Sequence, residues 1–373
     1  MHIPFCKQAC HYCNFHFVTS LRYKEQLVTA MCREIALQAH MLKGEEVETI
    51  YFGGGTPSLL STPECRQLLQ TIRAHFPVAP DAEITLEANP DDISLEKLQD
   101  WKASGINRLS IGVQSFFEQE LAWMNRAHNA DQALASLQLA TTHFDNITMD
   151  LIYGSPLLTD AMWEQNLQTA IGLGIPHLSC YALTVEEKTP LHKHISTQKK
   201  APVDGNIQAN QFLIGMKTLR HAGYEHYEVS NFAKPGFRSR HNSAYWQGVS
   251  YLGIGPSAHS YDGTSRLWNV SNNGQYMQAL ENGELARETE LLSATDKLNE
   301  YIMISLRTIE GLDLQRVSGQ WGKNIGQKIE KGLHQNLQNG QAVRKGDRIS
   351  LTDTGMLAAD GIAASLFQTS GSV

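Results

Sequence analysis

The chain has 373 residues, 42% of them hydrophobic, and a formal net charge of −7 at pH 7. This length favours one large α/β domain together with a smaller one. The acidic balance gives no electrostatic support to nucleic-acid binding, and no apolar run approaches the roughly 20 residues of a membrane span. We therefore expect a soluble, cytoplasmic protein in a reducing compartment.

Segments with strand character alternate with segments of helical periodicity up to residue 183. Residues 1–5 are expected to end a first strand, and further strands are expected at 47–52, 83–87, 108–113, 147–152 and 177–183. Helices are expected between them, at 21–42, after the capping sequence at 61–64, at 94–104, at 130–144 and at 162–173. This alternation predicts βαβ units and a parallel sheet. About six units fall short of a closed eightfold barrel, so we predict a partial (βα)6 barrel.

The sequence changes character after this region. Residues 186–205 are polar and indicate a linker or surface loop, 207–221 are expected to be helical, and 224–261 are rich in aromatic residues and glycine without a clear period. Helices expected at 294–309, 324–338 and 354–367, with a strand at 348–351, predict a small α+β domain at the C-terminus. The expected domains are therefore 1–225, a connecting segment 226–290, and 291–373.

Three cysteines, Cys6, Cys10 and Cys13, fall in one short loop with the spacing C-x3-C-x2-C. Thiolates select iron–sulfur clusters, zinc or copper(I). A four-iron cubane held by three cysteines keeps one iron open for chemistry, whereas a disulfide is disfavoured because the number of thiols is odd. Zinc remains an alternative, because a nearby histidine can supply the fourth ligand. The candidates for that ligand are His2, His11 and His16.

Polar residues and glycines follow several of the predicted strands. The carboxyl ends of parallel strands meet at one edge of a sheet or barrel, so these residues are expected to converge near the cysteine loop. Other interpretations stay open for each: a glycine run also suits a tight turn, and a carboxylate also suits a surface ion pair. A carboxylate inside an apolar strand needs a hydrogen-bonding partner. The residues concerned are Gly54, Gly55, Thr56, Glu87, Gln114, Arg126 and Asp150.

The stretch His2-Ile3-Pro4-Phe5-Cys6, with the cysteine spacing, resembles the radical S-adenosylmethionine (SAM) superfamily. Within it, the chain is similar to the branch that contains oxygen-independent coproporphyrinogen III oxidases and heme chaperones. The resemblance implies a radical SAM barrel, a 4Fe-4S cluster on the three cysteines, and SAM chelating the open iron through its amino and carboxylate groups. Leu351-Thr352 followed by Gly355 resembles the winged-helix-like tails of this branch.

The resemblance also implies which side chains contact SAM. Tyr12 matches a residue that touches the adenine, and the Gly54-Gly55-Thr56 loop matches one that grips the methionine end. The remaining matches are Glu87, Gln114, Arg126 and Asp150, of which Arg126 suits a carboxylate because a guanidinium can pair with it through two hydrogen bonds. Relatives carry a tyrosine at a position that would precede Met1 here, so we expect one contact to SAM to be missing.

Two features separate the oxidases from the heme chaperones. The oxidases carry a fourth cysteine where this chain has Phe15, and the segment from Arg240 to Trp246 contains an H-N-x-x-Y-W motif that resembles the heme chaperones. Its His241 is expected to be an axial ligand of heme iron, because imidazole is a common heme ligand. A packed aromatic cluster around a hydrogen-bonded histidine is the alternative.

The first hypothesis is therefore a heme chaperone that binds heme and transfers it to an acceptor protein, without coproporphyrinogen oxidase activity. The alternative is the oxidase itself, which decarboxylates coproporphyrinogen III through radical SAM chemistry. The expected cofactors are a 4Fe-4S cluster, SAM and heme. The expected partners are a heme acceptor such as a membrane respiratory protein, an electron donor that the sequence does not identify, and a second copy in a homodimer. No nucleic acid is expected.

Overall fold

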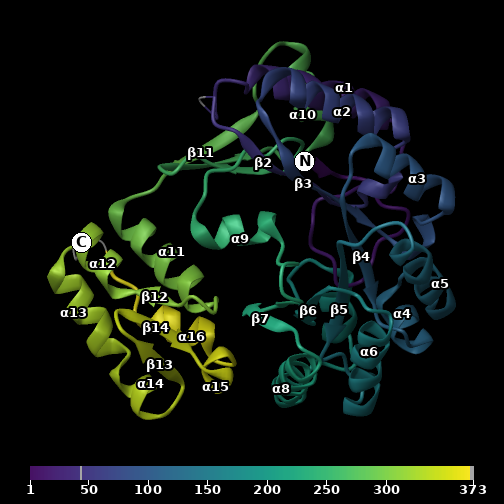
Figure 1. The fold of residues 1–373 in the computed structure, drawn as a ribbon. Helices are drawn as coiled ribbons and strands as arrows, with labels where there is room; N and C mark the ends of the chain where they lie inside the picture. Colours follow the sequence, from purple (N-terminus) through teal and green to yellow (C-terminus); the bar gives the residue numbers. More distant parts are fainter. Residues whose placement is uncertain (43, 370–373) are drawn as a thin grey trace. The chain divides into compact units, whose positions relative to one another are not determined.

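The computed structural model describes residues 1–42 and 44–369, and the chain packs into two compact units (Figure 1). The first unit contains Met1–Gln211 and Ser250–Glu290, and the second contains Phe212–Val249 and Leu291–Val373 as far as it is described. The three expected domains, with boundaries after 225 and 290, remain predictions, and each compact unit is described here by itself.

The first unit is built on a parallel sheet. Its strands lie side by side in chain order: β1 (His2–Ile3), β2 (Val47–Gly54), β3 (Val78–Ala88), β4 (Arg108–Gln114), β5 (Ile147–Tyr153) and β6 (His177–Ala182). Every neighbouring pair among them is parallel. No strand within 1–42 and 44–369 closes this sheet into a barrel. The predicted α/β class and partial barrel are confirmed.

Helices connect these strands and cover the outer side of the sheet, as Figure 1 shows for α2, α3, α5 and α6. Their bounds are α1 (Lys24–Leu37), η1 (Pro57–Leu59), α2 (Thr62–His75), η2 (Pro90–Asp92), α3 (Leu95–Ser104), α4 (Glu118–Met124), α5 (Ala130–Thr141), α6 (Asp160–Gly172), α7 (Pro190–Ser196) and α8 (Gly205–His221). Two of these, α7 and α8, follow β6, and the boundary between the units after Gln211 falls within α8. The predicted Ser61–Glu64 capping box is present at the start of α2. Gly105 ends α3 in the left-handed conformation, which glycine adopts without a steric penalty.

Besides α9 (Arg240–Gln247), α10 (Asn273–Glu281) and α12 (Leu314–Trp321), two seven-residue helices, α4 and α7, were not predicted from the sequence. The segment 186–205, predicted as a linker or loop, contains α7, whose Leu191 is buried beside Met124, Ile152 and Leu183. Helix α4 lies in a stretch for which no element was predicted. Each has only seven residues, which is too short for a helical period to stand out in the sequence.

Residues 250–290 complete the first unit around a buried carboxylate. This segment contains β9 (His259–Tyr261), β10 (Ser265–Asn269), α10 (Asn273–Glu281) and most of β11 (Arg287–Leu291), in the sheet order β11-β10-β9. Glu34 of α1 is fully buried and accepts hydrogen bonds from the Gly255 N–H at 2.7 Å, Asn269 Nδ2 at 2.6 Å and the Tyr276 hydroxyl. Burial raises the pKa of this carboxyl, and its donors fasten the segment to α1.

The second unit has helices around short antiparallel strands. Its elements are β7 (Glu225–Glu228), β8 (Asn231–Ala233), α9 (Arg240–Gln247), α11 (Ala294–Leu306), β12 (Leu312–Asp313), α12 (Leu314–Trp321), α13 (Lys323–Gly332), α14 (His334–Gln338), β13 (Ala342–Lys345), β14 (Arg348–Leu351), α15 (Asp353–Met356) and α16 (Ala359–Ser365). Strands β7 and β8 pair antiparallel, and β12, β14 and β13 form an antiparallel sheet in that order.

The C-terminal α+β character and the strand at 348–351 are confirmed. The single helix predicted at 354–367 is wrong, because the chain turns at Leu357–Ala358 between α15 and α16. This turn leaves Met356, Ile362 and Leu366 all buried, so packing interrupts a run that the sequence alone extends as one helix. Among the described residues, no helix combines the length and apolar character that crossing a bilayer requires.

We predict that Glu34→Ala destabilises the first unit by about 3 kcal/mol or more, because it leaves several buried donors without an acceptor. The urea midpoint of the purified protein and the hydrogen exchange of residues 253–276 report this change. Glu25→Ala, on an exposed position of the same helix, is the matched control and is expected to change stability little. Equal effects of the two substitutions would contradict the role given to Glu34.

Candidate functional site

The cysteine loop follows β1 and carries three thiols that are only partly exposed. Cys6, Cys10 and Cys13 are all free and of intermediate exposure. Burial raises the pKa of Cys6 to about 11 and also raises the pKa of Cys13. In the metal-free chain these two thiols therefore stay protonated at neutral pH, and a metal that binds them must displace protons. Among the described residues, no three His, Cys, Asp or Glu side chains are placed to hold one metal ion.

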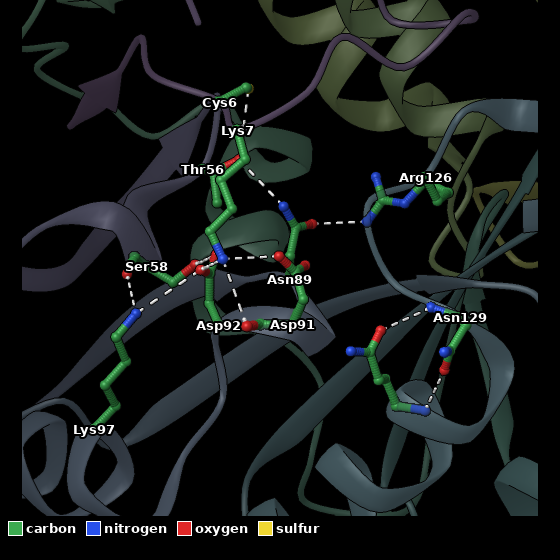
Figure 2. A network of polar contacts seen from close by, with 11 residues as sticks. Cys6, Lys7, Thr56, Ser58, Asn89, Asp91, Asp92, Lys97, Arg126 and Asn129 are labelled. Carbon is green, nitrogen blue, oxygen red and sulfur yellow. Dashed lines mark hydrogen bonds and ion pairs between the residues drawn. The ribbon is translucent and has the colours of Figure 1, made fainter. Parts of the chain in front are cut away.

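The first half of the loop is fastened to η2 by an ion-pair network (Figure 2). The Lys7 ammonium lies 2.8 Å from a carboxylate oxygen of Asp91 and also contacts the Asp92 carboxylate. The Asp92 side chain is 1% exposed and accepts a hydrogen bond from the Ser58 hydroxyl at 2.8 Å. Lys97 donates to the Ser58 carbonyl at 3.0 Å. Because the carboxylate of Asp92 is buried and paired, this network fixes the backbone next to Cys6.

A chain of side-chain contacts joins the loop to the ends of β2, β3 and β4 (Figure 2). The Thr56 hydroxyl lies 3.5 Å from Cys6 Sγ and accepts a hydrogen bond from Asn89 Nδ2 at 3.2 Å. The Asn89 side-chain oxygen Oδ1 accepts a hydrogen bond from the Arg126 guanidinium at 2.7 Å. The same guanidinium lies 3.3 Å from both Cys10 Sγ and the Tyr12 hydroxyl. Of the residues expected to converge on the cysteine loop, Thr56 and Arg126 are thus observed in contact with it.

The glycine run at the end of β2 is required first of all by packing. A Cβ on Gly55 would lie 2.7 Å from the Phe5 carbonyl oxygen and 2.8 Å from that of Ile3, both backbone atoms. A Cβ on Gly54, whose φ is +110°, would lie 2.8–2.9 Å from the His2 ring. The close approach of the chain around β1 therefore needs glycines at these positions. Their expected contact with SAM stays a prediction.

Two carboxylates lie on β3 and β5, the strands on either side of β4 in the sheet. Glu87 on β3 accepts from the Tyr51 hydroxyl at 2.7 Å and the Gly54 N–H at 3.2 Å, and burial raises its pKa to about 7. Asp150 on β5 accepts from the Ser110 hydroxyl at 3.4 Å, and burial raises its pKa to about 6. The partner that a carboxylate inside an apolar strand requires is therefore present. A nearby cation stabilises the ionised form of both acids, so this pair suits a positively charged ligand.

Gln114 adopts a backbone conformation that is unusual for its residue type. Its φ is +68°, and the pairing of β4 with β5 shifts register between Gly112 and Gln114. A Cβ on Gly112 would lie 3.0 Å from Gln114 Nε2 and 3.4 Å from the Arg126 guanidinium, so both side chains gather over this glycine. Such strained positions concentrate at functional sites. This observation supports the position predicted for Gln114 and leaves its contact with SAM a prediction.

Each of the three histidines considered as a fourth zinc ligand places one ring nitrogen against an oxygen atom of another residue. His2 Nε2 lies 2.9 Å from the His16 carbonyl oxygen, His11 Nδ1 lies 3.1 Å from the Trp123 carbonyl oxygen, and His16 Nε2 lies 2.8 Å from Asn273 Oδ1. Burial lowers the pKa of His2 to about 4. These contacts leave one nitrogen of each ring for any other role.

His241 lies in the second unit, apart in the chain from all other predicted site residues. It occupies the first turn of α9, where the Ser239 side chain caps the helix by accepting from the Asn242 N–H. No residue of α9 is buried. His241 Nε2 lies 3.1 Å from the Tyr245 hydroxyl, and the two rings meet edge to face. An imidazole and a tyrosine ring on a partly exposed helix suit a flat, iron-containing ligand.

The residues fit the group that the cysteine spacing suggests. Three sulfur ligands lie on one loop, and the Nε of Arg126 is a buried nitrogen without a hydrogen-bond partner among the described residues. A carboxylate bound at this guanidinium would supply that partner. Asn89, Lys7 and Asp92 belong to the site but were not selected from the sequence. Asn89 follows Glu87 at the end of β3, so its position after a strand was the available signal.

Comparisons with known proteins agree on one superfamily. Residues 1–170 match the family model of the radical SAM superfamily, and residues 292–358 match that of the HemN C-terminal domain. The 4Fe-4S cluster and SAM are the cofactors that a radical SAM domain implies. A heme chaperone HemW of Mycobacterium tuberculosis is 34% identical over 98% of this chain and 93% of its own length. The heme chaperone HemW of Escherichia coli is 36% identical, over 83% of this chain and 82% of its own.

The chain is also similar to two further proteins, one of which is a solved structure. A mitochondrial radical S-adenosyl methionine domain-containing protein 1 of Bos taurus is 34% identical, over 84% of this chain and 74% of its own. Among solved structures, the coproporphyrinogen III oxidase HemN of Escherichia coli, a radical SAM enzyme, superposes with a TM-score of 0.81. It is 26% identical, over 98% of this chain and 89% of its own.

We predict that Gly55→Ala lowers the thermal stability of the metal-free protein and increases the reactivity of the Cys6 thiol toward an alkylating reagent. The added Cβ must displace the backbone of β1, which leads directly into the cysteine loop. Gly172→Ala at the exposed end of α6 is the control, because nothing lies within 4 Å of its Cβ position. It is expected to be neutral or slightly stabilising, and a similar loss in both variants would contradict this role of Gly55.

We also predict that Glu87 makes a contribution to the stability of the metal-free protein that is lost as the pH rises from about 4.5 to about 7. Burial raises the pKa of Glu87 from 4.5 to about 7, so in this range the folded chain holds a proton that the unfolded chain has lost. Glu87→Gln is expected to flatten this part of the urea-midpoint profile. An unchanged slope in the variant would show that Glu87 does not cause it.

Proposed function

Because this chain belongs to the radical SAM superfamily and, within it, to the HemW family, we propose that it is a heme chaperone that binds heme and transfers it to an acceptor protein. The observation that carries the proposal is the H-N-x-x-Y-W motif placed on α9, where no side chain is buried. His241 would be the iron ligand, and Tyr245 and Trp246 would offer flat surfaces to the porphyrin.

The first unit is proposed to hold the 4Fe-4S cluster and SAM. Cys6, Cys10 and Cys13 would ligate three irons, and SAM would occupy the fourth. When bound, the cluster supplies electrons at low potential to SAM. The chain's own contribution is orientation, because its loop and strand ends hold the ligands in a fixed relation.

Individual side chains would divide the binding of SAM. The guanidinium of Arg126 would pair with the SAM carboxylate, and Glu87 with an ammonium or ribose group. Asp150 and Gln114 would add polar contacts, and Tyr12 would contact the adenine. Gly54, Gly55 and Thr56 would receive the methionine end.

The second candidate function is oxygen-independent coproporphyrinogen III oxidase. The similarity of fold to HemN along almost the whole chain favours it. Against it stands Phe15, which is 65% exposed at the position where the oxidases carry a fourth cysteine. A phenylalanine cannot ligate iron, so this chain lacks that part of the oxidase pattern.

The proposed partners follow from a carrier function. Heme has to pass to an acceptor, for which a membrane respiratory protein is proposed, and the cluster needs an electron donor whose identity stays open. A homodimer is proposed as the assembled form. The cytoplasm is the proposed compartment, because unpaired cysteine thiols persist in a reducing environment.

We predict that His241→Ala weakens heme binding at least tenfold, since it removes the iron–nitrogen bond that fixes the ligand. Heme titration followed by absorbance, on protein with and without reconstituted cluster, measures the effect. His221→Ala is the matched control, because His221 is an exposed histidine on α8 outside the motif. It is expected to bind heme as the unsubstituted chain does.

Two outcomes would contradict the proposal. Heme binding that is equal in His241→Ala and the unsubstituted chain would remove the motif as the heme site. Turnover of coproporphyrinogen III with consumption of SAM by the unsubstituted protein would establish the oxidase function instead.

A further inference from the structure

The cysteine loop lies against the C-terminal end of α4. The last carbonyl groups of a helix have no partner inside the helix and need donors from elsewhere. Here the backbone N–H of His11 donates to the Met124 carbonyl oxygen at 3.0 Å. The ring nitrogen Nδ1 of His11 lies 3.1 Å from the Trp123 carbonyl oxygen. Lys200 also reaches the Trp123 carbonyl oxygen. The loop therefore supplies donors that the end of α4 requires.

Asn125, the residue after α4, makes the densest set of contacts with the loop. Gln8 Nε2 donates to its carbonyl oxygen at 3.0 Å and to its side-chain Oδ1 at 2.9 Å. Its own Nδ2 donates to the Ala9 carbonyl oxygen at 2.7 Å. These contacts lie between Cys6 and Cys10, so they determine the path of the chain between two of the three thiols.

The backbone of Asn125 explains how its side chain reaches the loop. It has φ 60° and ψ 49°, the left-handed conformation, and its N–H still bonds back to the Ala122 carbonyl oxygen. Asparagine adopts this conformation more readily than most residues other than glycine. The reversal ends α4 and turns the carboxamide toward Gln8 and Ala9.

The same reversal places Arg126 at the other side of the loop. The Arg126 N–H bonds to the Leu121 carbonyl oxygen, and its guanidinium lies 3.3 Å from Cys10 Sγ and from the Tyr12 hydroxyl. Residues 123–126 thus contact the loop from Gln8 to Tyr12. The loop that would carry the cluster and the arginine that would pair with SAM are held by one short segment.

We infer that Asn125 is a positioning residue, whose carboxamide seats the Gln8–Ala9 half of the cysteine loop on the end of α4 before any cofactor binds. It thereby holds the thiols and the Arg126 guanidinium in one fixed relation. This inference rests on the proposed function for the use of that relation by a cluster and SAM, but the loop geometry itself exists without them.

A simpler role for Asn125 is only to end α4, and this role has a different structural requirement. Ending α4 requires only the left-handed backbone, which glycine provides as well as asparagine. The bonds to Gln8 and Ala9 through the side chain require the carboxamide. Asn125→Gly therefore keeps the helix end and removes the side-chain contacts, which separates the two roles.

The decisive measurement uses the metal-free full chain. Thiol alkylation by iodoacetamide, followed for each cysteine by mass spectrometry, is expected to become about three- to tenfold faster at Cys10 in Asn125→Gly, because the two lost hydrogen bonds are each of modest net strength. Cys32 on α1, also of intermediate exposure, is an internal reference whose rate is expected to stay unchanged.

The matched control is Asn129→Ala. Asn129 is an exposed asparagine that caps α5 by accepting from the Gln132 N–H and has no contact with the cysteine loop among the described bonds. Its loss is expected to lower the unfolding temperature, as removal of a helix cap does, while the alkylation rate at Cys10 stays as in the unsubstituted chain.

A second measurement follows the loaded protein. After anaerobic reconstitution, Asn125→Gly is expected to lose iron to a chelator about tenfold faster, and to require more SAM to change the electron paramagnetic resonance spectrum of the reduced cluster. Unchanged alkylation at Cys10 in Asn125→Gly, or an equal rise in Asn129→Ala, would overturn the inference. Failure of the unsubstituted chain to take up a cluster would instead refute the proposed cofactor, since the alkylation result does not depend on it.

Discussion

One guanidinium, that of Arg126, holds the candidate site together. It contacts Cys10 Sγ and the Tyr12 hydroxyl on the cysteine loop, Asn89 at the end of β3, and the Gly112 carbonyl oxygen on β4. These contacts give partners to both terminal nitrogens of the guanidinium, while its Nε has none among the described residues. Because its partners come from three separate parts of the chain, the loop cannot move without breaking several charge-assisted hydrogen bonds.

The interior of the parallel sheet complements this cation with acids. Glu87 and Asp150 point inward from neighbouring parts of the sheet, and burial raises the pKa of both. Because the pKa of each carboxyl is raised, its protonated form costs little free energy in the free protein. A cation that binds nearby stabilises the ionised form. The guanidinium at the loop and these two carboxylates support the proposal that SAM, which carries a carboxylate together with cationic groups, binds here.

The chain assigns its two proposed ligands to two different compact units. The cysteine loop and the residues around Arg126 belong to the first unit, and the heme motif on α9 belongs to the second. Because no residue of α9 is buried, this helix leaves a flat ligand room to bind and to leave, as the proposed carrier function requires.

The sequence alone determined the class of fold, the alternation of strands and helices up to residue 183 and the helix cap at Ser61, because hydrophobic periodicity and capping residues act over a few neighbours. It also singled out the cysteine loop and the strand-end residues. It missed α4, α7, α9, α10 and α12, each of nine residues or fewer, and it merged α13 with α14 and α15 with α16, since short helices leave little periodic signal.

Only the tertiary structure decided what each selected residue contacts. Gly55 and Phe5, Thr56 and Asn89, and Asn125 and Gln8 are far apart in the sequence and meet only when the sheet curves and α4 ends. Asn125 was not selected from the sequence, and its left-handed backbone turns its side chain toward the loop. Local patterns record the preferences of neighbouring residues, whereas a binding site depends on distances between segments that packing brings together.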